Sequence, residues 1–491
     1  MWSPSTKWTA KNFSGPRNSV PPWRTLLLAG LGVFSAAFGV AAETPRLLVR
    51  NAMLVTMEPD QAEPFLGWLL VGADGRIAGI GRGAPAAGVT AAQTLDAREQ
   101  VVMPGFLSGH SHLASSVMRG VNAGRELDGM IDFRPTFMDG RFYEEGDVYA
   151  FTLHGSLDYL LHGITTAFNY PNRRCPPQYY HEAFLGEIAS GQRFVYGYNV
   201  PDAPYEKARE EFLAFKAITD RHKDSPFFLR LGLAKNGHLG RIAGHSQFPT
   251  EVKIAKEFGL PLQVHFLESS FYQKQNRHDF RYMKDSGALE IPIMYAHFIH
   301  SDDTILAESA KAGAVAIWNP LSNGRLASGL ADIPKYIKAG LTVGMGLDGQ
   351  NTADLANPFE NMRMGLYNIR MAYESAGVLT PLDVMRLHTL GTAKALGVAD
   401  KVGSLKVGKF ADFLLIDLTE PDTGPVYDFY GSLVFSCSFP NIARIYVGGD
   451  LVAEKGRLVK HDSVALGRDV RFRMERNREK TTRMLAAMAK P

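Results

Sequence analysis

Eight short runs rich in β-branched, aromatic and small residues follow one another between residues 101 and 349, and helical stretches separate them. Strands that alternate with helices are typical of parallel βα units, and eight such units predict an α/β chain built on a (β/α)8 barrel. The helical stretches carry matching start and stop signals, such as Asp302 before one helix and Gly313 after it. The predicted strands are 101–112, 163–170, 193–200, 227–235, 260–268, 291–300, 314–320 and 342–349.

A second pattern, of strands joined by glycine-rich turns, flanks the predicted barrel on both sides. With 491 residues of which 45% are hydrophobic, the chain is long enough for one large domain and a smaller companion. We therefore expect a second, smaller β-sandwich domain built from both ends of the chain, residues 43–100 and 401–460. We expect the barrel to occupy residues 101–400, and residues 461–491 to form a C-terminal helical tail that lies on the barrel.

The first 42 residues read as a signal peptide. A basic stretch that ends at Arg24 runs into the apolar segment 25–40, and small residues follow before Glu43. The apolar segment holds about 16 residues, which is short for a membrane-spanning helix of roughly 20. We expect a periplasmic or secreted protein with no stable membrane insertion after cleavage. An uncleaved anchor helix is the alternative.

Charge and cysteine content exclude two classes of protein. The net charge of the chain is +3, and four basic residues of its head contribute +4 to it: Lys7, Lys11, Arg17 and Arg24. The remaining residues therefore have a net charge of −1, and no basic patch among them predicts nucleic-acid binding. The two cysteines, Cys175 and Cys437, cannot build a disulfide framework.

Five side chains suited to metal or proton chemistry fall at the ends of predicted barrel strands. His110 and His112 are two residues apart and face the same side of the first strand. His265, His297 and Asp348 lie late in the fifth, sixth and eighth runs, at the end where such barrels hold their active sites. Imidazoles with a carboxylate suit one divalent cation, with Zn²⁺ the first choice and Fe²⁺ the second, whereas Mg²⁺ and Ca²⁺ prefer all-oxygen sites.

Glu268 follows His265 by three residues, where the strand gives way to a loop. A carboxylate beside an activated water can take up the water's proton and later deliver it to a leaving nitrogen. We therefore expect Glu268 to be catalytic, although an ordinary surface glutamate would give the same local sequence.

Taken together, these motifs resemble the amidohydrolase superfamily, in particular its cytosine-deaminase-like branch, which includes triazine chlorohydrolases, guanine deaminase and adenosylhomocysteine deaminases. The resemblance runs from about residue 45 to 460. Its carriers are Pro104-Gly-Phe-Leu-Ser-Gly-His-Ser-His-Leu, Met118-Arg-Gly, His265-Phe-Leu-Glu-Ser, Ala296-His-Phe-Ile-His-Ser-Asp, Asn319-Pro-Leu-Ser-Asn-Gly-Arg-Leu-Ala-Ser-Gly, Gly346-Leu-Asp-Gly and Gly403-Ser-Leu-Lys-Val-Gly-Lys-Phe-Ala-Asp.

The resemblance implies a role for each of these positions. One metal would be held by His110, His112, His265 and Asp348. Glu268 would move protons, His297 would polarise the substrate or steady the water, and Asp348 would also accept a proton from water. Asn319 and the pair Ser322–Asn323 look like residues that shape the pocket or its loops. Relatives are commonly dimers or larger, so a homo-oligomer is possible.

Two departures keep alternatives open. Where deaminases of this branch usually carry a Trp-Leu motif, this chain has Leu127-Asp-Gly-Met-Ile-Asp-Phe-Arg-Pro, which weakens a nucleoside or guanine substrate. Lys235 ends the fourth run, where binuclear relatives place a carbamylated lysine, so a two-metal site with His297 as a ligand is the rival arrangement. Lys235 would otherwise be a cation that faces the substrate.

The sequence therefore predicts a metal-dependent hydrolase that cleaves a non-peptide C–N bond of a small amide, urea, carbamate or substituted heterocycle. The alternative is an aminohydrolase that releases ammonia from a purine, pyrimidine or triazine ring. A third hypothesis, a metal-holding scaffold without turnover, conflicts with the presence of all six residues expected for chemistry.

Overall fold

The structure is a computed structural model that describes residues 43–137, 139–171, 177–235, 248–270 and 273–489. The predicted signal peptide, residues 1–42, and Cys175 lie outside the described residues. Cys437 is a buried free thiol. The described part contains two sheets, one of eight strands and one of nine.

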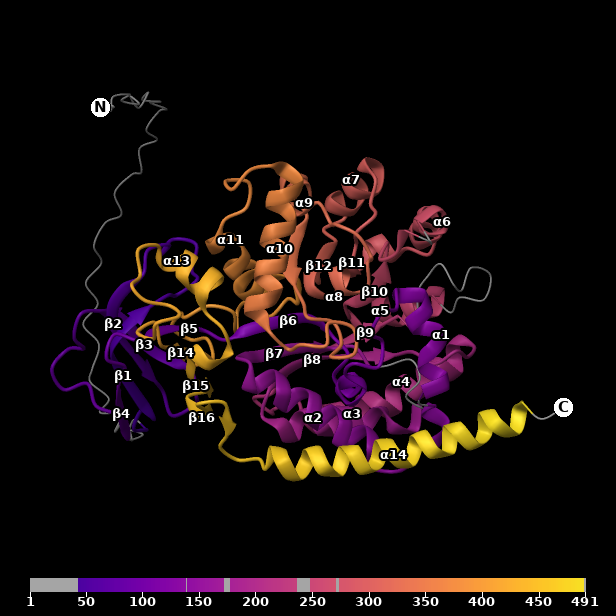
Figure 1. Ribbon diagram of the computed structural model, residues 1–491, viewed down its shortest axis with the longest axis horizontal. Helices are drawn as coiled ribbons and strands as arrows, with labels where there is room; N and C mark the ends of the chain where they lie inside the picture. The colour runs from indigo at the N-terminus through magenta and orange to yellow at the C-terminus, as the bar shows by residue number, and fades with distance from the viewer. Residues whose placement is uncertain (1–42, 138, 172–176, 236–247, 271–272, 490–491) are drawn as a thin grey trace, which may run out of the picture. The chain divides into compact units, whose positions relative to one another are not determined.

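The eight-stranded sheet is the predicted barrel (Figure 1). Its strands are parallel and adjacent in chain order, and an isolated bridge between Ser111 and Asp348 links the first strand to the segment after the last. Sequential pairing follows from the right-handed βα connection, which places each new strand beside the one before it. The strands are β6 (Phe106–Ser111), β7 (Ile164–Asn169), β8 (Arg193–Asn199), β9 (Phe228–Ala234), β10 (Leu262–Phe266), β11 (Ile293–His297), β12 (Val315–Trp318) and β13 (Thr342–Met345).

Helices follow the barrel strands, as the start and stop signals predict. Asp302 accepts a hydrogen bond from the Ile305 backbone N–H at the start of its helix, and Gly259 and Gly313 take positive φ where two helices end. The helices are α1 (Leu127–Phe137), α2 (Asp147–Leu161), α3 (Tyr180–Ser190), α4 (Tyr205–Asp220), α5 (Phe248–Phe258), α6 (Gln273–Asp285), α7 (Asp303–Lys311), α8 (Pro320–Arg325), α9 (Ile333–Lys338), α10 (Pro358–Tyr373), α11 (Pro381–Arg386) and α12 (Thr392–Ala395).

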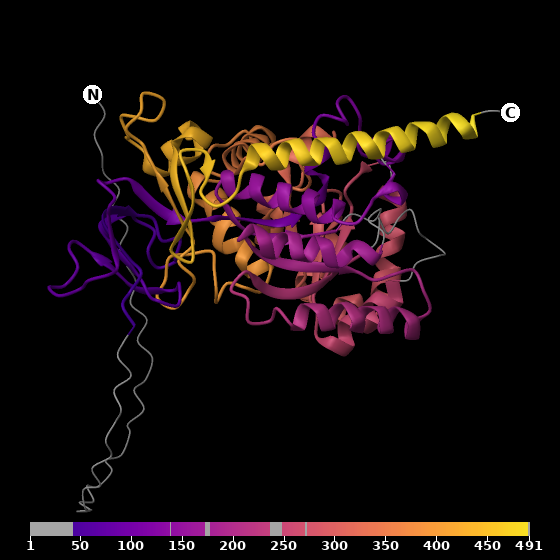
Figure 2. The same ribbon diagram turned by 90° about the horizontal axis from the view of Figure 1, so that it is seen from below.

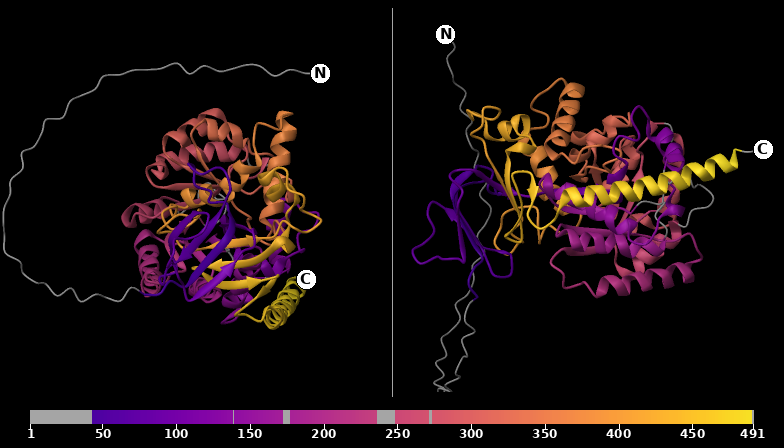
Figure 3. Two further views of the ribbon diagram at one scale, coloured as in Figure 1. Left: turned by 90° about the vertical axis from the view of Figure 1, so that its left-hand side faces the viewer. Right: turned by 60° about the horizontal axis from the view of Figure 1, so that its bottom comes forward.

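The nine-stranded sheet confirms a second β unit made from both ends of the chain. Strands from residues 47–104 lie beside strands from residues 413–458, which the left view of Figure 3 shows as indigo next to yellow. All nine strands join in one hydrogen-bonded sheet, mostly antiparallel, around a common apolar core. They are β1 (Leu47–Leu54), β2 (Phe65–Val71), β3 (Ile77–Arg82), β4 (Gln93–Asp96), β5 (Val101–Pro104), β14 (Phe413–Ile416), β15 (Ile442–Val447), β16 (Asp450–Glu454) and β17 (Arg457–Leu458).

The first predicted barrel strand, 101–112, divides between the two sheets. Val101–Pro104 pairs with β1 and β14 in the nine-stranded sheet, and only Phe106–Ser111 enters the barrel. Gly105 lies between the two parts of the strand. It packs so closely against Thr165 that a Cβ at this position would lie 2.1 Å from Thr165 Oγ1. The expected start of the barrel at residue 101 is therefore corrected to residue 106.

The C-terminal tail forms the helix α14 (Ser463–Met488), which runs alongside α2 (Figure 2). Val470 and Met474 pack against the barrel side, and Arg473 and Arg476 both pair with the buried carboxylate of Asp147. The tail helix therefore has an apolar side that packs on the barrel domain and basic residues that pair with it. Within the ranges that the structure describes, no helix is both long enough and apolar enough to span a bilayer.

A buried ion pair connects the barrel to the nine-stranded sheet. Arg193, at the start of β8, donates from Nε to Asp412 Oδ2 at 2.6 Å and from Nη2 to Oδ1 at 3.0 Å. Both side chains are almost fully buried, and the guanidinium lies 3.6 Å from the centre of the Phe410 ring. Since a buried charge is costly without its partner, this contact makes each unit depend on the other.

We predict that Asp412→Ala lowers the free energy of unfolding by about 3–5 kcal/mol, because it leaves the Arg193 guanidinium buried without its carboxylate. The exposed pair between Arg46 and Asp450 provides the control, and Asp450→Ala should cost less than about 1 kcal/mol. Urea unfolding followed by circular dichroism measures both. Equal losses in the two variants would contradict the role given to the buried pair.

Candidate active site

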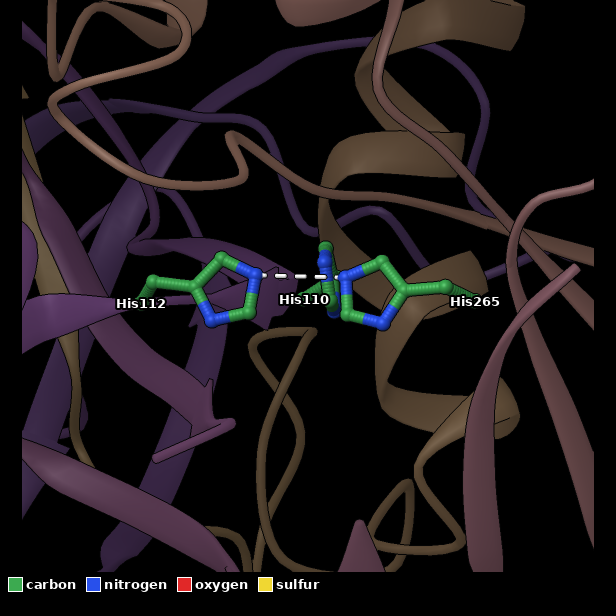
Figure 4. Close-up of side chains that lie close together, drawn as sticks. All are labelled: His110, His112 and His265. Carbon is green, nitrogen blue, oxygen red and sulfur yellow. Dashed lines mark hydrogen bonds between the residues drawn. The ribbon is translucent and has the colours of Figure 1, made fainter. Parts of the chain in front are cut away.

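The predicted site residues converge at the carboxyl ends of the barrel strands. His110 lies in β6 and His112 directly follows it, His265 lies in β10, His297 ends β11, and Asp348 comes three residues after β13. In the close-up of Figure 4, the His112 and His265 rings face each other, with His110 between them. The ligand atoms of these three histidines all lie within 4.8 Å of one another.

The spacing of these atoms fits a single tetrahedral cation. His112 Nε2 lies 3.2 Å from His265 Nε2, and Asp348 Oδ1 lies 3.4 Å from His112 Nε2 and 3.6 Å from His110 Nε2. Four ligands at the usual Zn–N and Zn–O distances are about 3.3 Å apart. His110 Nε2 is buried without a hydrogen-bond partner, as expected of an atom that faces a metal. Three imidazoles and one carboxylate therefore form a site for one divalent cation, with zinc favoured.

The outer nitrogens of two histidines fix which nitrogen faces inward. His110 Nδ1 donates to Gln263 Oε1 at 2.7 Å, and His112 Nδ1 donates to the Tyr170 carbonyl at 2.8 Å. Gln263 Nε2 donates in turn to the Gly109 carbonyl, which sets the orientation of its amide. Both Nε2 lone pairs are thus available to a cation. Burial lowers the pKa of His110 well below its usual value, and the neighbouring His112 lowers it further, so His110 is held neutral.

Asp348 sits on a strained piece of backbone with φ of +58°. Its carbonyl accepts from the Tyr159 hydroxyl at 2.8 Å, and its Oδ2 accepts from the Ser322 hydroxyl at 2.5 Å. Burial by itself would raise the pKa of this carboxyl, but the surrounding imidazoles of His297, His112 and His110 outweigh burial and lower it. Asp348 therefore stays ionised across the physiological range.

Glu268 and His297 face each other beside this cluster. Glu268 Oε1 lies 3.5 Å from His297 Nε2, and both side chains are buried. Burial raises the pKa of Glu268 to about 7; His297 opposes the rise, whereas the negative charge of Asp348 adds to it. Two neighbouring carboxyls whose pKa values are driven apart are typical of acid–base catalysis. Glu268 can hold or release a proton near neutral pH, whereas Asp348 stays charged.

Lys235, the residue behind the two-metal alternative, has a different partner in the structure. Its ammonium lies 3.6 Å from Glu251 Oε1 of α5, and both side chains are buried. Among the described residues, the groups whose ligand atoms could share an ion draw on the three histidines of the metal cluster, His297, Glu268 and Asp348. The single-metal arrangement stays a prediction, and the structure adds that Lys235 lies beside the Glu251 carboxylate.

Several residues that support the site were missed by the sequence analysis. Gln263 and Tyr170 hold the metal-facing histidines, and Tyr159 holds the Asp348 backbone. Only Gln263 left a signal, because it lies two residues before His265 and so faces the same side of β10. The others come from segments distant in sequence.

Glycine 346 makes the close approach of β13 to the site possible. A Cβ at this position would lie 2.4 Å from Asn319 Oδ1 and 2.9 Å from the His110 backbone nitrogen. Any larger residue would push the segment that leads to Asp348 away from β6. This steric restriction explains the glycine at the first position of the Gly346-Leu-Asp-Gly motif.

Residues 127–135, which stand where deaminases carry the Trp-Leu motif, begin the helix α1 near the site. Leu127 and Met130 pack against Leu326, beyond the end of α8. Asp128 is close enough for its charge to raise the pKa of Glu268. The loop before α1 is tied to the segment after Asp348, since Asn122 Nδ2 donates to the Asn351 carbonyl at 2.8 Å. The residues that replace the Trp-Leu motif therefore lie near Glu268.

Comparison with known proteins agrees with this geometry. A family model described as the amidohydrolase family matches residues 101–452. A 5-methylthioadenosine/S-adenosylhomocysteine deaminase of Syntrophobacter fumaroxidans is 26% identical over 424 residues, which cover 84% of this chain and 94% of that protein. A protein of the same name from Desulforudis audaxviator is 28% identical, and the alignment covers 85% of this chain and 95% of that protein.

Solved structures show the same fold. An adenosine deaminase from Xanthomonas campestris with bound zinc aligns with a TM-score of 0.77 at 20% identity, over 89% of this chain and all of the other. A mutant atrazine chlorohydrolase from Arthrobacter aurescens, complexed with zinc and atraton, aligns with a TM-score of 0.77 at 21% identity, over 87% of this chain. Since the family model matches most of the chain and the site has the arrangement described above, this protein belongs to the amidohydrolase family.

Proposed function

We propose that this protein is a metal-dependent hydrolase that removes nitrogen from an sp² carbon of a small molecule, with ring deamination as the leading reaction. The observation that carries the proposal is the pairing of the three-histidine and Asp348 cluster with Glu268, a buried carboxyl whose pKa is about 7. This combination supplies a cation site and a proton carrier next to each other.

When bound, a divalent cation supplies Lewis-acid activation of water and of the bond under attack. The cluster residues His110, His112, His265 and Asp348 would hold it. Their part is to fix its position, since the histidines are anchored from behind and Asp348 keeps its negative charge next to them.

Glu268 is placed to carry the proton between water and the leaving nitrogen. Hydrolysis of a C–N bond requires one proton to leave the attacking water and one to reach the departing amine. A carboxyl with a pKa of about 7 accepts the first and donates the second without a large energetic cost for either state. His297, which faces Glu268 at 3.5 Å, lies where it can orient the water or polarise the reacting group of the substrate.

Similarity to deaminases supports a heterocyclic substrate. The two relatives described above are called 5-methylthioadenosine/S-adenosylhomocysteine deaminases, and each matches along nearly its whole length. The α1 segment near Glu268 differs from the motif usual in those enzymes, and this favours the second candidate, a small amide, urea or carbamate. In both cases Glu268 protonates a departing nitrogen.

A panel of substrates distinguishes the two candidates. The purified, zinc-loaded protein is incubated with amino-substituted purines, pyrimidines and triazines, and in parallel with aryl amides, ureas and carbamates. We expect release of ammonia from amino-heterocycles, detected by a coupled dehydrogenase assay. If amines are released only from the aryl amides, ureas and carbamates, the protein is a hydrolase of the amide, urea or carbamate type. No release from either set would contradict the proposal.

We predict that Glu268→Gln keeps the metal and lowers kcat by about 10²–10⁴-fold, because the amide cannot accept the proton. His265→Ala should lose both the metal and the activity, because it removes a ligand. Metal analysis by mass spectrometry and a rate assay on each variant check this. Normal turnover by Glu268→Gln would exclude a proton-transfer role.

We also propose that the protein is exported, on the strength of the basic and apolar head before Glu43. Expression of the full chain in a Gram-negative host should yield a periplasmic protein whose N-terminus, measured by intact-mass spectrometry, is Glu43. The variant Leu27→Arg, which interrupts the apolar segment, should remain uncleaved in the cytoplasm. A mature chain that retains residues 1–42 would contradict export by cleavage.

A further inference from the structure

Two consecutive residues of the short helix α8 contact two different functional side chains. Ser322 bonds to Asp348, which follows β13, and Asn323 bonds to His297, which ends β11. Ser322 and Asn323 are both almost fully buried. One turn of α8 thus reaches both Asp348 and His297.

The Ser322 contact distinguishes the two oxygens of the Asp348 carboxylate. The hydroxyl donates to Oδ2 at 2.5 Å, while Oδ1 lies within 3.6 Å of the Nε2 atoms of His110 and His112. Oδ1 accepts a hydrogen bond of its own, from the Gly349 backbone N–H at 2.8 Å, and it is the oxygen on the side of the two histidines. Without the hydroxyl, the Gly349 N–H would remain as a hydrogen-bond donor to the carboxylate, whose terminal torsion has a broad energy profile and would be less tightly fixed.

The Asn323 contact distinguishes the two nitrogens of His297 in the same way. Its Oδ1 accepts from Nδ1 at 2.8 Å, so Nε2 points to the interior, 3.5 Å from Glu268 Oε1 and 3.9 Å from Asp348 Oδ2. His297 Nε2 is buried without a hydrogen-bond partner, which leaves it available to water or substrate.

Both functional residues also have strained backbones. The φ angles are +73° at His297 and +58° at Asp348, in the left-handed region that residues other than glycine rarely adopt. Strain of this kind persists only where surrounding contacts over-determine the conformation. The two bonds from α8 are among the contacts that do so.

The helix α8 is itself held firmly in place. Asn361 of α10 accepts from the Leu321 backbone N–H at 3.1 Å and donates to the Gly346 carbonyl at 3.0 Å. At the other end, Arg325 forms an ion pair with Asp354 at 2.7 Å. A helix fixed at both ends can transmit a defined position to the side chains that it carries.

We propose that Ser322 and Asn323 are positioning residues: Ser322 reserves Oδ1 of Asp348 for the cation, and Asn323 reserves Nε2 of His297 for the reacting groups. The role of Asn323 in turnover rests on the proposed function, whereas the role of Ser322 in cation binding does not. These residues thus serve the site directly rather than only shaping its loops.

The Ser322 part is tested by zinc affinity, measured by competition with a chromophoric chelator. Ser322→Ala should bind zinc about 10–100-fold more weakly than the unaltered protein. Ser322→Thr, which keeps a hydroxyl, should restore binding. Ser309→Ala, which removes a buried hydroxyl that donates to Tyr295 and not to a site residue, should bind normally. Unchanged affinity in Ser322→Ala, or an equal loss in Ser309→Ala, would overturn this part.

The Asn323 part is tested with Asn323→Leu, which removes the acceptor. Asn323 Nδ2 has no hydrogen-bond partner among the described residues, so leucine sacrifices no second bond. Zinc affinity should stay normal while kcat falls about 10–100-fold and KM changes little. A crystal structure of the zinc-bound variant should show the His297 ring turned away from Glu268.

The crystal structure keeps this test independent of the substrate. If no C–N substrate is turned over, the proposed function fails, but the orientation of His297 and the zinc affinity of Ser322→Ala still decide the inference. An unmoved His297 ring in Asn323→Leu, or an unchanged kcat, would overturn the Asn323 part.

Discussion

The site exists because the barrel closes on itself at Asp348. The Asp348 backbone N–H donates to the His110 carbonyl at 3.0 Å, and the His112 N–H lies 3.4 Å from the Asp348 carbonyl, so the first strand and the segment after the last are joined. This seam brings the Asp348 carboxylate to His110 of β6, which is 238 residues away in the chain, and to His112, which follows β6. Gly346 keeps the approach sterically possible. Without closure, no set of four ligands would form.

Electrostatics then give each group at this rim a different protonation state. Burial disfavours charge throughout, which keeps His110 neutral and raises the pKa of Glu268. Asp348 is the exception, because several imidazoles surround it and favour its ionised form. A neutral imidazole is suited to binding a cation, a charged carboxylate to completing a ligand set, and a carboxyl near its pKa to moving a proton. The division of labour follows from burial and neighbours rather than from residue type.

Much of the fold and the first layer of the site could be predicted from the sequence. The eight βα units, the β unit made from both chain ends and the tail helix all appear, because hydrophobic periodicity and helix punctuation act locally. The assignment of Val101–Pro104 to the barrel was wrong, since a strand that continues from one sheet into another shows no break in its apolar pattern. The roles of Tyr159 and of Gln263 behind His110 also escaped prediction.

The sequence by itself determined which residue types stand at the ends of the barrel strands, and hence the family and the kind of chemistry. Two histidines on one strand face and an acid after the eighth strand are readable because strand geometry has a period of two and barrel ends are functional. Only the tertiary structure decided which oxygen of Asp348 and which nitrogen of His297 face inward, and that Lys235 pairs with Glu251. Those choices depend on hydrogen bonds from distant segments, and their partners become neighbours only when the chain has folded.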